Sequence, residues 1–153
     1  MNFFLNLNPF IQVIISGFIS GLAFHPLELG FLTWGSFVPV IHVFNISHFK
    51  KNIIYGYIFG LAFNLTAFYW IGANSGADVL TVFGSLFAAV FYLASFWAGA
   101  GFLFSLISKG DQRILGNIFF PFIIVIIEYV RSFGPLGFPW SNLALSQSKY
   151  IYF

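Results

Sequence analysis

The stretch that decides the fold is Val79–Ile107, VLTVFGSLFAAVFYLASFWAGAGFLFSLI, which contains no charged residue. A helix needs about 20 predominantly apolar residues to cross the hydrocarbon core of a bilayer, and this stretch is long enough to cross with tilt. Its apolar residues run continuously, without the alternation that is typical of a membrane β-barrel strand. Because lipid cannot satisfy free backbone groups, the stretch predicts a transmembrane helix.

Similar apolar stretches lie on both sides of it, and they predict further helices at residues 3–24, 29–46, 53–72 and 114–131. The first is not expected to be a signal peptide, because no basic residue precedes it and no small-x-small cleavage site follows it. Residues 132–148 are expected to form an outer-side loop whose prolines and glycines break the helix, a re-entrant or interfacial segment. The sequence therefore predicts an all-α polytopic membrane protein with about five helices, in which residues 1–153 form a single membrane domain.

The composition excludes several other classes of protein. The 153 residues are 59% hydrophobic and only 7% charged, whereas an ordinary soluble domain is about 25% charged. Disordered chains are polar and charged, so disorder is excluded as well. The net charge of +2 is too small to indicate a nucleic-acid partner. Because the chain contains no cysteine, it holds no disulfide, no thiolate metal site and no cysteine nucleophile.

The charged links between the expected helices predict the orientation of the bundle. The basic residues of these links fall after the second and the fourth helix, as Lys50, Lys51, Lys109 and Arg113. Glu28 and Asp78 lie in the other two links, without a neighbouring Lys or Arg. By the positive-inside rule, the N-terminus is expected in the cytoplasm, and everything after the last helix is expected on the periplasmic side.

Glu128 and Arg131 are the ionisable residues closest to a functional pattern. They are three positions apart, so they share a helix face and can pair. An ionisable residue within a membrane segment indicates a functional site by default. A structural ion pair that fixes the helix end is the alternative, and the sequence leaves both interpretations open.

Aromatic residues gather near the same outer end of the bundle. Phe138, Pro139 and Trp140 belong to the broken segment, and Tyr69 and Trp70 end the third expected helix. These residues are either simple interfacial anchors or the lining of a lipid-facing cleft.

Other patterns carry little chemistry. His25, His42 and His48 do not share a helix face at metal-ligand spacing, so neither a metal nor a cofactor is expected. No Gly-x-Ser-x-Gly elbow or phosphate-binding glycine loop occurs. Three small-residue pairs at four-residue spacing are candidates for close helix contacts, although glycine is also simply common in membrane helices. The pairs are Gly17 with Gly21, Gly56 with Gly60, and Ser95 with Gly99.

Several motifs in this order resemble apolipoprotein N-acyltransferases. The most specific are Glu128-Tyr129-Val130-Arg131, Gly137-Phe138-Pro139-Trp140 and Ser146-Gln147. Upstream, Ala23-Phe24 with Pro26, then Pro39, Gly56, Gly60 and Tyr69-Trp70-Ile71 also match. The chain departs from the family at His25, Glu28 and Ala144-Leu145.

The resemblance implies a bacterial inner-membrane enzyme with its functional face in the periplasm. Such an enzyme moves an acyl chain from a membrane phospholipid to the N-terminal diacylglyceryl-cysteine of a lipoprotein, so phospholipid and lipoprotein are the expected partners. The family acts through a cysteine thioester, with a glutamate and a lysine, on a nitrilase-like domain that follows these helices. The chain stops at Phe153, before that domain, so we expect it to be truncated and inactive alone. No catalytic residue is assigned here, and neither Glu28 nor Glu128 is the catalytic glutamate.

The expected role of this part is the lipid-facing base of the site, formed by Tyr69, Trp70, Glu128, Arg131, Phe138, Pro139 and Trp140. One alternative is a non-catalytic membrane anchor or partner of a separately encoded enzyme. A small transporter ranks last, because no charge lies in the middle of an expected helix.

Overall fold

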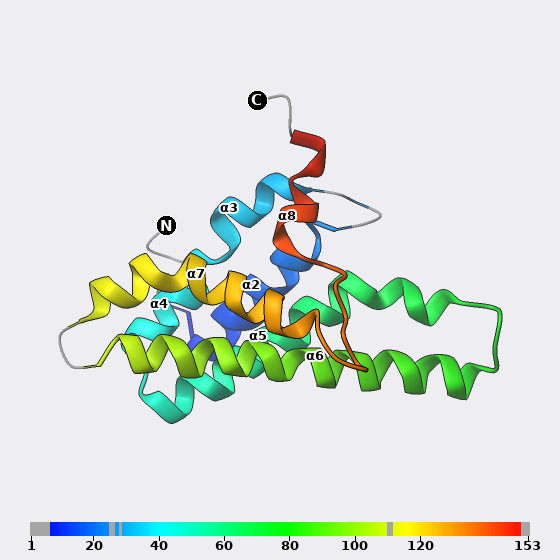
Figure 1. Ribbon diagram of the computed structural model, residues 1–153, viewed down its shortest axis with the longest axis horizontal. Helices are drawn as coiled ribbons and strands as arrows, with labels where there is room; N and C mark the ends of the chain where they lie inside the picture. Colours follow the sequence, from blue (N-terminus) through cyan, green and yellow to red (C-terminus); the bar gives the residue numbers. More distant parts are fainter. Residues whose placement is uncertain (1–6, 25–26, 28, 110–111, 151–153) are drawn as a thin grey trace.

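The computed structural model describes residues 7–24, 27, 29–109 and 112–150, and every regular element in these residues is helical. Three helical segments are long and apolar enough to cross a membrane. They are α5 (Phe49–Phe68), continued by the 3-10 helix η2 (Tyr69–Ala73), α6 (Val79–Ile107) and α7 (Arg113–Arg131). They lie lengthwise along the molecule (Figure 1). The predicted all-α membrane fold is therefore confirmed.

The N-terminal part contains shorter elements. Helix α2 (Pro9–Gly21) begins after Asn8, whose side chain accepts a hydrogen bond from the N–H of Phe10 at 2.9 Å. The expected single helix over 29–46 is divided into η1 (Gly30–Leu32), α3 (Thr33–Ser36) and α4 (Val38–Ile46).

Proline chemistry explains the break between α3 and α4. Pro39 lies in the first turn of α4, where it has no N–H to donate to the preceding turn. Both N-terminal apolar segments are shorter than a full span, so five crossings stay a prediction. Residues 1–6, His25, Pro26 and Glu28 lie outside the described residues.

The central helix of the expected bundle is placed as its sequence predicts, from Val79 to Ile107. Its start is capped by Asp78, whose carboxylate accepts hydrogen bonds from the N–H of Thr81 at 3.0 Å and from its hydroxyl at 2.6 Å. Helix α5 begins four residues earlier than the expected 53–72, at Phe49. The last elements of the described residues are α8 (Leu143–Ser146) and the 3-10 helix η3 (Ser148–Tyr150).

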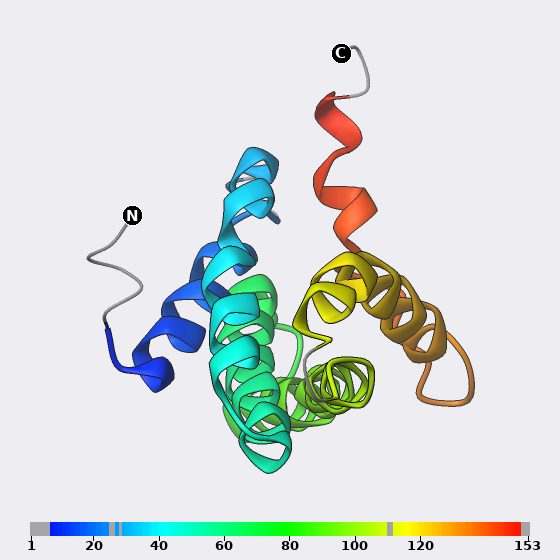
Figure 2. The same ribbon diagram turned by 90° about the vertical axis from the view of Figure 1, so that its left-hand side faces the viewer.

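Two glycine pairs lie at close helix contacts. A Cβ atom on Gly17 would meet the side chain of Ala62 at 2.9 Å, so α2 lies directly against α5. A Cβ atom on Gly60 would meet the backbone of Ala94 at 2.9 Å, so α5 lies equally close to α6. Figure 2 shows α6 nearly end-on, with α5 and α7 on different sides of it. Small residues thus let the helix backbones come into close contact. Membrane helices associate through such packing, because the hydrophobic effect does not drive their association in lipid.

The core between these helices is unusually aromatic. Its buried rings are Phe44, Phe59, Phe63, Trp97, Phe104 and Phe120. The ring of Phe59 meets Trp97 edge to face, with centroids 4.7 Å apart. Other large apolar side chains face outward, including Phe83, Phe87 and Phe91 along α6. A surface of this kind is unstable in water and fits contact with lipid chains.

Candidate functional site

The C-terminal end of α7 carries Glu128 and Arg131, and both side chains bind the segment that follows the helix. Oε1 of Glu128 accepts a hydrogen bond from the N–H of Leu143 at 2.7 Å. Nη2 of Arg131 donates to the carbonyl oxygen of Trp140 at 3.0 Å and to Oδ1 of Asn142 at 2.8 Å. The end of α7 therefore binds the last residues of the loop and the first residue of α8.

The spacing of Glu128 and Arg131 suggests a pair, and the two opposite charges do attract each other, but the hydrogen bonds of both side chains go to the loop. Among the hydrogen bonds of the described residues, none joins these two side chains. Arg131 is also only 2% exposed, and both hydrogen bonds of its guanidinium go to the loop. Both side chains hold the loop in place, so their role in this structure is to position the loop residues.

The segment between α7 and α8 folds back on the end of α7. Gly134 has φ of +86°, a conformation that glycine adopts without steric cost. The N–H of Gly137 donates to the carbonyl of Gly134 at 2.9 Å, and the N–H of Phe138 donates to the carbonyl of Arg131 at 2.9 Å. These bonds close a compact loop, and they confirm that the helix is broken here.

The loop packs beside a membrane-spanning helix. The ring of Phe138 meets Phe68 edge to face at 5.1 Å and packs on a buried cluster that includes Leu86 and Val90 of α6. Because a helix rises about 1.5 Å per residue, these positions lie about 10–17 Å along α6 from its start. Figure 1 shows the segment after α7 descending toward α6 before it rises to α8. The broken segment thus packs on protein beside the N-terminal half of α6, away from its first residue.

An aromatic cluster joins this loop to the end of α5. The indoles of Trp70 and Trp140 stack with centroids 5.8 Å apart, and Phe138 lies 5.3 Å from Trp140. Pro139 is exposed between these two loop rings. Tyr69 lies elsewhere, because it lines an apolar groove of about 650 Å³ between α2 and α5. The structure therefore brings together most of the expected aromatic residues, while Tyr69 belongs to a separate surface.

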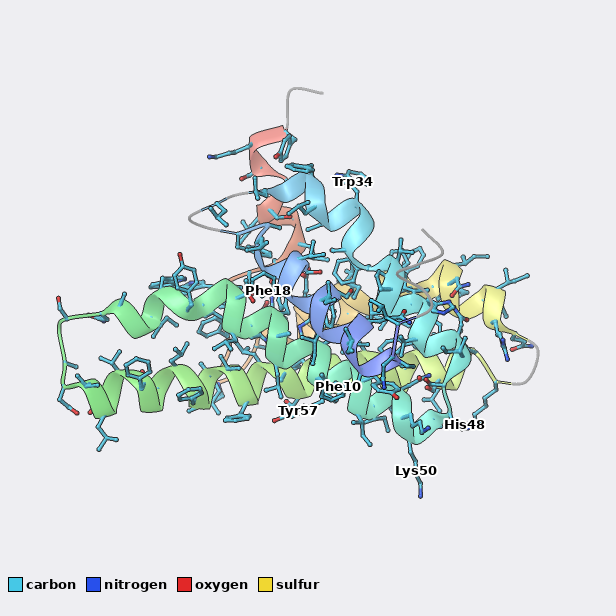
Figure 3. All side chains as sticks on the ribbon, turned by 180° about the vertical axis from the view of Figure 1, so that it is seen from behind. Phe10, Phe18, Trp34, His48, Lys50 and Tyr57 are labelled. Carbon is cyan, nitrogen blue, oxygen red and sulfur yellow. The ribbon has the colours of Figure 1, made fainter. Side chains whose placement is uncertain are left out.

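A second apolar groove, of about 480 Å³, runs between the α3–α4 segment and α7. Phe37 and Ile124 contribute to its walls, and Glu128 and Gln147 are polar groups in its lining. Trp34, also in the lining, is 82% exposed, and Figure 3 shows it on α3. The groove is thus an apolar channel with polar groups where α7 meets α8.

Gln147 belongs to the Ser146-Gln147 motif, for which the sequence predicts no structural role. Its Nε2 donates to the carbonyl of Gly30 and to the hydroxyl of Thr33, both at 2.9 Å. These bonds tie α8 to η1 across the groove. In the sequence, only the Ser146-Gln147 motif indicates a role for Gln147. Nothing in the sequence indicates a role for Trp34, which lies inside an expected transmembrane helix.

Comparison with known proteins identifies the family of the chain. The sequence profile of the family described as "Apolipoprotein N-acyltransferase N-terminal domain" matches residues 16–153. A curated protein named apolipoprotein N-acyltransferase, from Geobacter metallireducens (strain ATCC 53774 / DSM 7210 / GS-15), is 28% identical over 156 aligned positions. The alignment covers 93% of this chain and 28% of that relative, so the chain spans less than a third of the relative's length. On the profile match over most of its length, the chain belongs to the apolipoprotein N-acyltransferase N-terminal domain family.

Proposed function

We propose that this chain forms the membrane part of an enzyme that transfers an acyl chain from a phospholipid to the N-terminal diacylglyceryl-cysteine of bacterial lipoproteins. The observation that carries the proposal is the family match over residues 16–153. In this proposal the chain supplies the lipid-facing base of the site. The catalytic groups belong to a nitrilase-like domain outside it.

The groove between the α3–α4 segment and α7 is the proposed path of the donor's acyl chain. Its volume of about 480 Å³ falls within the range of about 300–1,000 Å³ that is usual for small-ligand sites. Phe37 and Ile124 present apolar walls to the chain, and Glu128 and Gln147 lie at the polar end. The stacked indoles of Trp70 and Trp140, which we call the aromatic platform, are proposed to lie beneath the soluble domain.

A bulky substitution in the groove tests this assignment in the complete gene product. Val125 lines the groove and is 63% exposed, so Val125→Trp fills the channel without disturbing the core. Ile126→Trp is the matched control, because Ile126 is 51% exposed on the next position of α7 and is not among the described lining residues. We expect Val125→Trp alone to slow acyl transfer from phospholipid to a diacylglyceryl-cysteine peptide, measured by mass spectrometry. Equal turnover of the two variants would remove the groove from the proposal.

The coding DNA beyond codon 153 tests the larger claim. An open reading frame that continues into a domain with a catalytic Glu, Lys and Cys supports the membrane part of an acyltransferase. A stop codon followed by an unrelated gene supports instead a non-catalytic membrane partner of a separately encoded enzyme.

The proposed site faces the periplasm of the inner membrane, with the N-terminus in the cytoplasm. These 153 residues contain no cysteine, so a single cysteine introduced into them reports their orientation once every cysteine elsewhere in the gene product has been replaced by serine. Gly76→Cys lies in the link before α6, and Lys50→Cys lies near the start of α5. A membrane-impermeant maleimide added to the periplasmic side should label the first variant and spare the second. The reverse pattern would place the site in the cytoplasm.

A further inference from the structure

A polar pocket of about 490 Å³ lies at the end of the bundle opposite the aromatic platform. Here α4 ends, α5 begins, α6 ends and α7 begins. The described part of its lining contains two cations, Lys109 and Arg113, together with His48, and it contains no acidic residue. Asp111 lies outside the described residues. The positive lining attracts an anion.

Three polar atoms at this pocket are buried and lack a hydrogen-bond partner among the described residues. They are Oδ1 of Asn45, Oδ1 of Asn52 and the hydroxyl of Ser108. Asn52 is only 3% exposed. Its Nδ2 already donates to the carbonyl of Phe44 and to the hydroxyl of Ser105, both at 2.9 Å, which leaves Oδ1 as the free acceptor. Because unpaired buried polar atoms are costly, these atoms indicate a ligand that brings both acceptors and donors.

We propose that this pocket binds the headgroup of an anionic, hydroxyl-bearing phospholipid, for which phosphatidylglycerol is the probe. The phosphate accepts hydrogen bonds from Lys109, Arg113 and the Ser108 hydroxyl. The glycerol hydroxyls donate to the amide oxygens of Asn45 and Asn52. Basic pockets between transmembrane helices are a recurring form of lipid headgroup site. Membrane-spanning helices with phenylalanines at the pocket wall favour a lipid over a free phosphate.

The chain contains a matched control for the charge of this end. Lys50 and Lys51 are exposed in the first turn of α5 and are not among the described lining residues. Figure 3 shows Lys50 pointing away from the bundle. The variant Lys50→Ala/Lys51→Ala therefore removes the same charge from the same end without changing the pocket.

The test uses the complete gene product in detergent, stripped of lipid, with binding of dioctanoyl-phosphatidylglycerol followed by native mass spectrometry. Lys109→Gln/Arg113→Gln should weaken binding about thirtyfold, since each cation near a lipid phosphate contributes about fivefold. Lys50→Ala/Lys51→Ala should bind as the unmodified protein does. Equal affinity in the two double variants overturns the assignment to the pocket. If the first double variant does not fold, Ser108→Ala takes its place. This variant should weaken binding and leave the helical circular dichroism unchanged. Unchanged binding by Ser108→Ala would then overturn the assignment to the pocket.

Two further ligands identify the occupant. Dioctanoyl-phosphatidylethanolamine should bind more weakly, because it is zwitterionic, and equal binding overturns an anionic site. Inorganic phosphate should fail to displace the lipid at millimolar concentration. Displacement with the same dependence on Lys109 and Arg113 would make free phosphate the occupant and overturn the lipid. The site lies away from the proposed acyl groove, so its failure leaves the acyl-transfer proposal untouched.

Discussion

The indole of Trp70 stacks on that of Trp140, with centroids 5.8 Å apart and ring planes inclined by 27°. Trp70 belongs to η2, at the end of α5, and Trp140 belongs to the loop after α7. The stacking therefore joins two parts of the chain that are distant in sequence. Aromatic pairs of this kind contribute about 0.5–1.5 kcal/mol beyond the burial of their surface.

The contribution of this pair can be measured by a double-mutant cycle. We expect Trp70→Ala and Trp140→Ala to be coupled by about 0.5–1.5 kcal/mol in the free energy of unfolding. Unfolding is followed by far-UV circular dichroism during titration of mixed micelles with SDS. As a control, Trp34→Ala should add to Trp140→Ala without coupling, because Trp34 is 82% exposed on α3. Additive effects of Trp70 and Trp140 would show that the stacking carries no stability.

The sequence predicted which aromatic residues lie at this end of the bundle but not which of them meet. Tyr69 and Trp70 are adjacent, and the sequence treated them as one feature. In η2 successive residues are about 120° apart around the axis, so only Trp70 reaches the loop while Tyr69 faces α2. The rotation of a helix end depends on tertiary packing, which a single sequence does not encode locally.

The anchoring of α8 by Glu128 leads to a second prediction. Glu128→Gln keeps an amide oxygen that can accept from the N–H of Leu143, whereas Glu128→Leu has no acceptor. Protection of the Leu143 amide from hydrogen exchange should therefore survive in the first variant and be lost in the second. Mass spectrometry of peptic fragments, or NMR, reports this protection. Equal exchange in both variants would mean that the carboxylate does not hold α8.

The roles of Glu128 and Arg131 also show what the spacing of two residues leaves out. Positions three apart predict a pair on one helix face, and the two residues do share that face. The loop, however, brings its own peptide groups to the helix end, and buried peptide groups need partners. The N–H of Leu143 and the carbonyl of Trp140 take up the two side chains. A loop without regular structure gives no sequence signal for such bonds.

The length of α6 was easier to predict than the break within residues 29–46. The uninterrupted apolar run from Val79 to Ile107 is the observed extent of α6, since the run contains neither proline nor a charged residue. Pro39 interrupts the run at 29–46, although its neighbours are equally apolar. Hydrophobicity indicates only that a segment prefers the membrane. Whether the helical hydrogen bonds continue through the segment depends on proline, which has no N–H to donate.

Helix contact through glycine gives a third prediction, with two glycines that respond in opposite directions. A Cβ atom on Gly60 would lie 2.8 Å from Cβ of Trp97 and 2.9 Å from Cα of Ala94. Gly60→Ala should therefore destabilise the protein by about 1–3 kcal/mol. Nothing lies within 4 Å of a Cβ atom on Gly84, so Gly84→Ala should stabilise α6 by about 0.5–1 kcal/mol. SDS titration measures both, and a neutral Gly60→Ala would contradict the close α5–α6 contact.

The cap of α6 makes stability depend on pH. Hydrogen bonds from the hydroxyl and the N–H of Thr81 hold the pKa of Asp78 below its ordinary value. A lowered pKa in the folded state means that the unfolded state binds the proton more tightly, so the cap contributes fully above about pH 5 and fades as the pH falls below about 4. In Asp78→Asn the cap is neutral at every pH. The difference in melting temperature between the original protein and Asp78→Asn, measured in detergent from pH 7 to pH 3, should therefore shrink on acidification. A difference that stays constant over this range would show that the Asp78 carboxylate does not stabilise the start of α6.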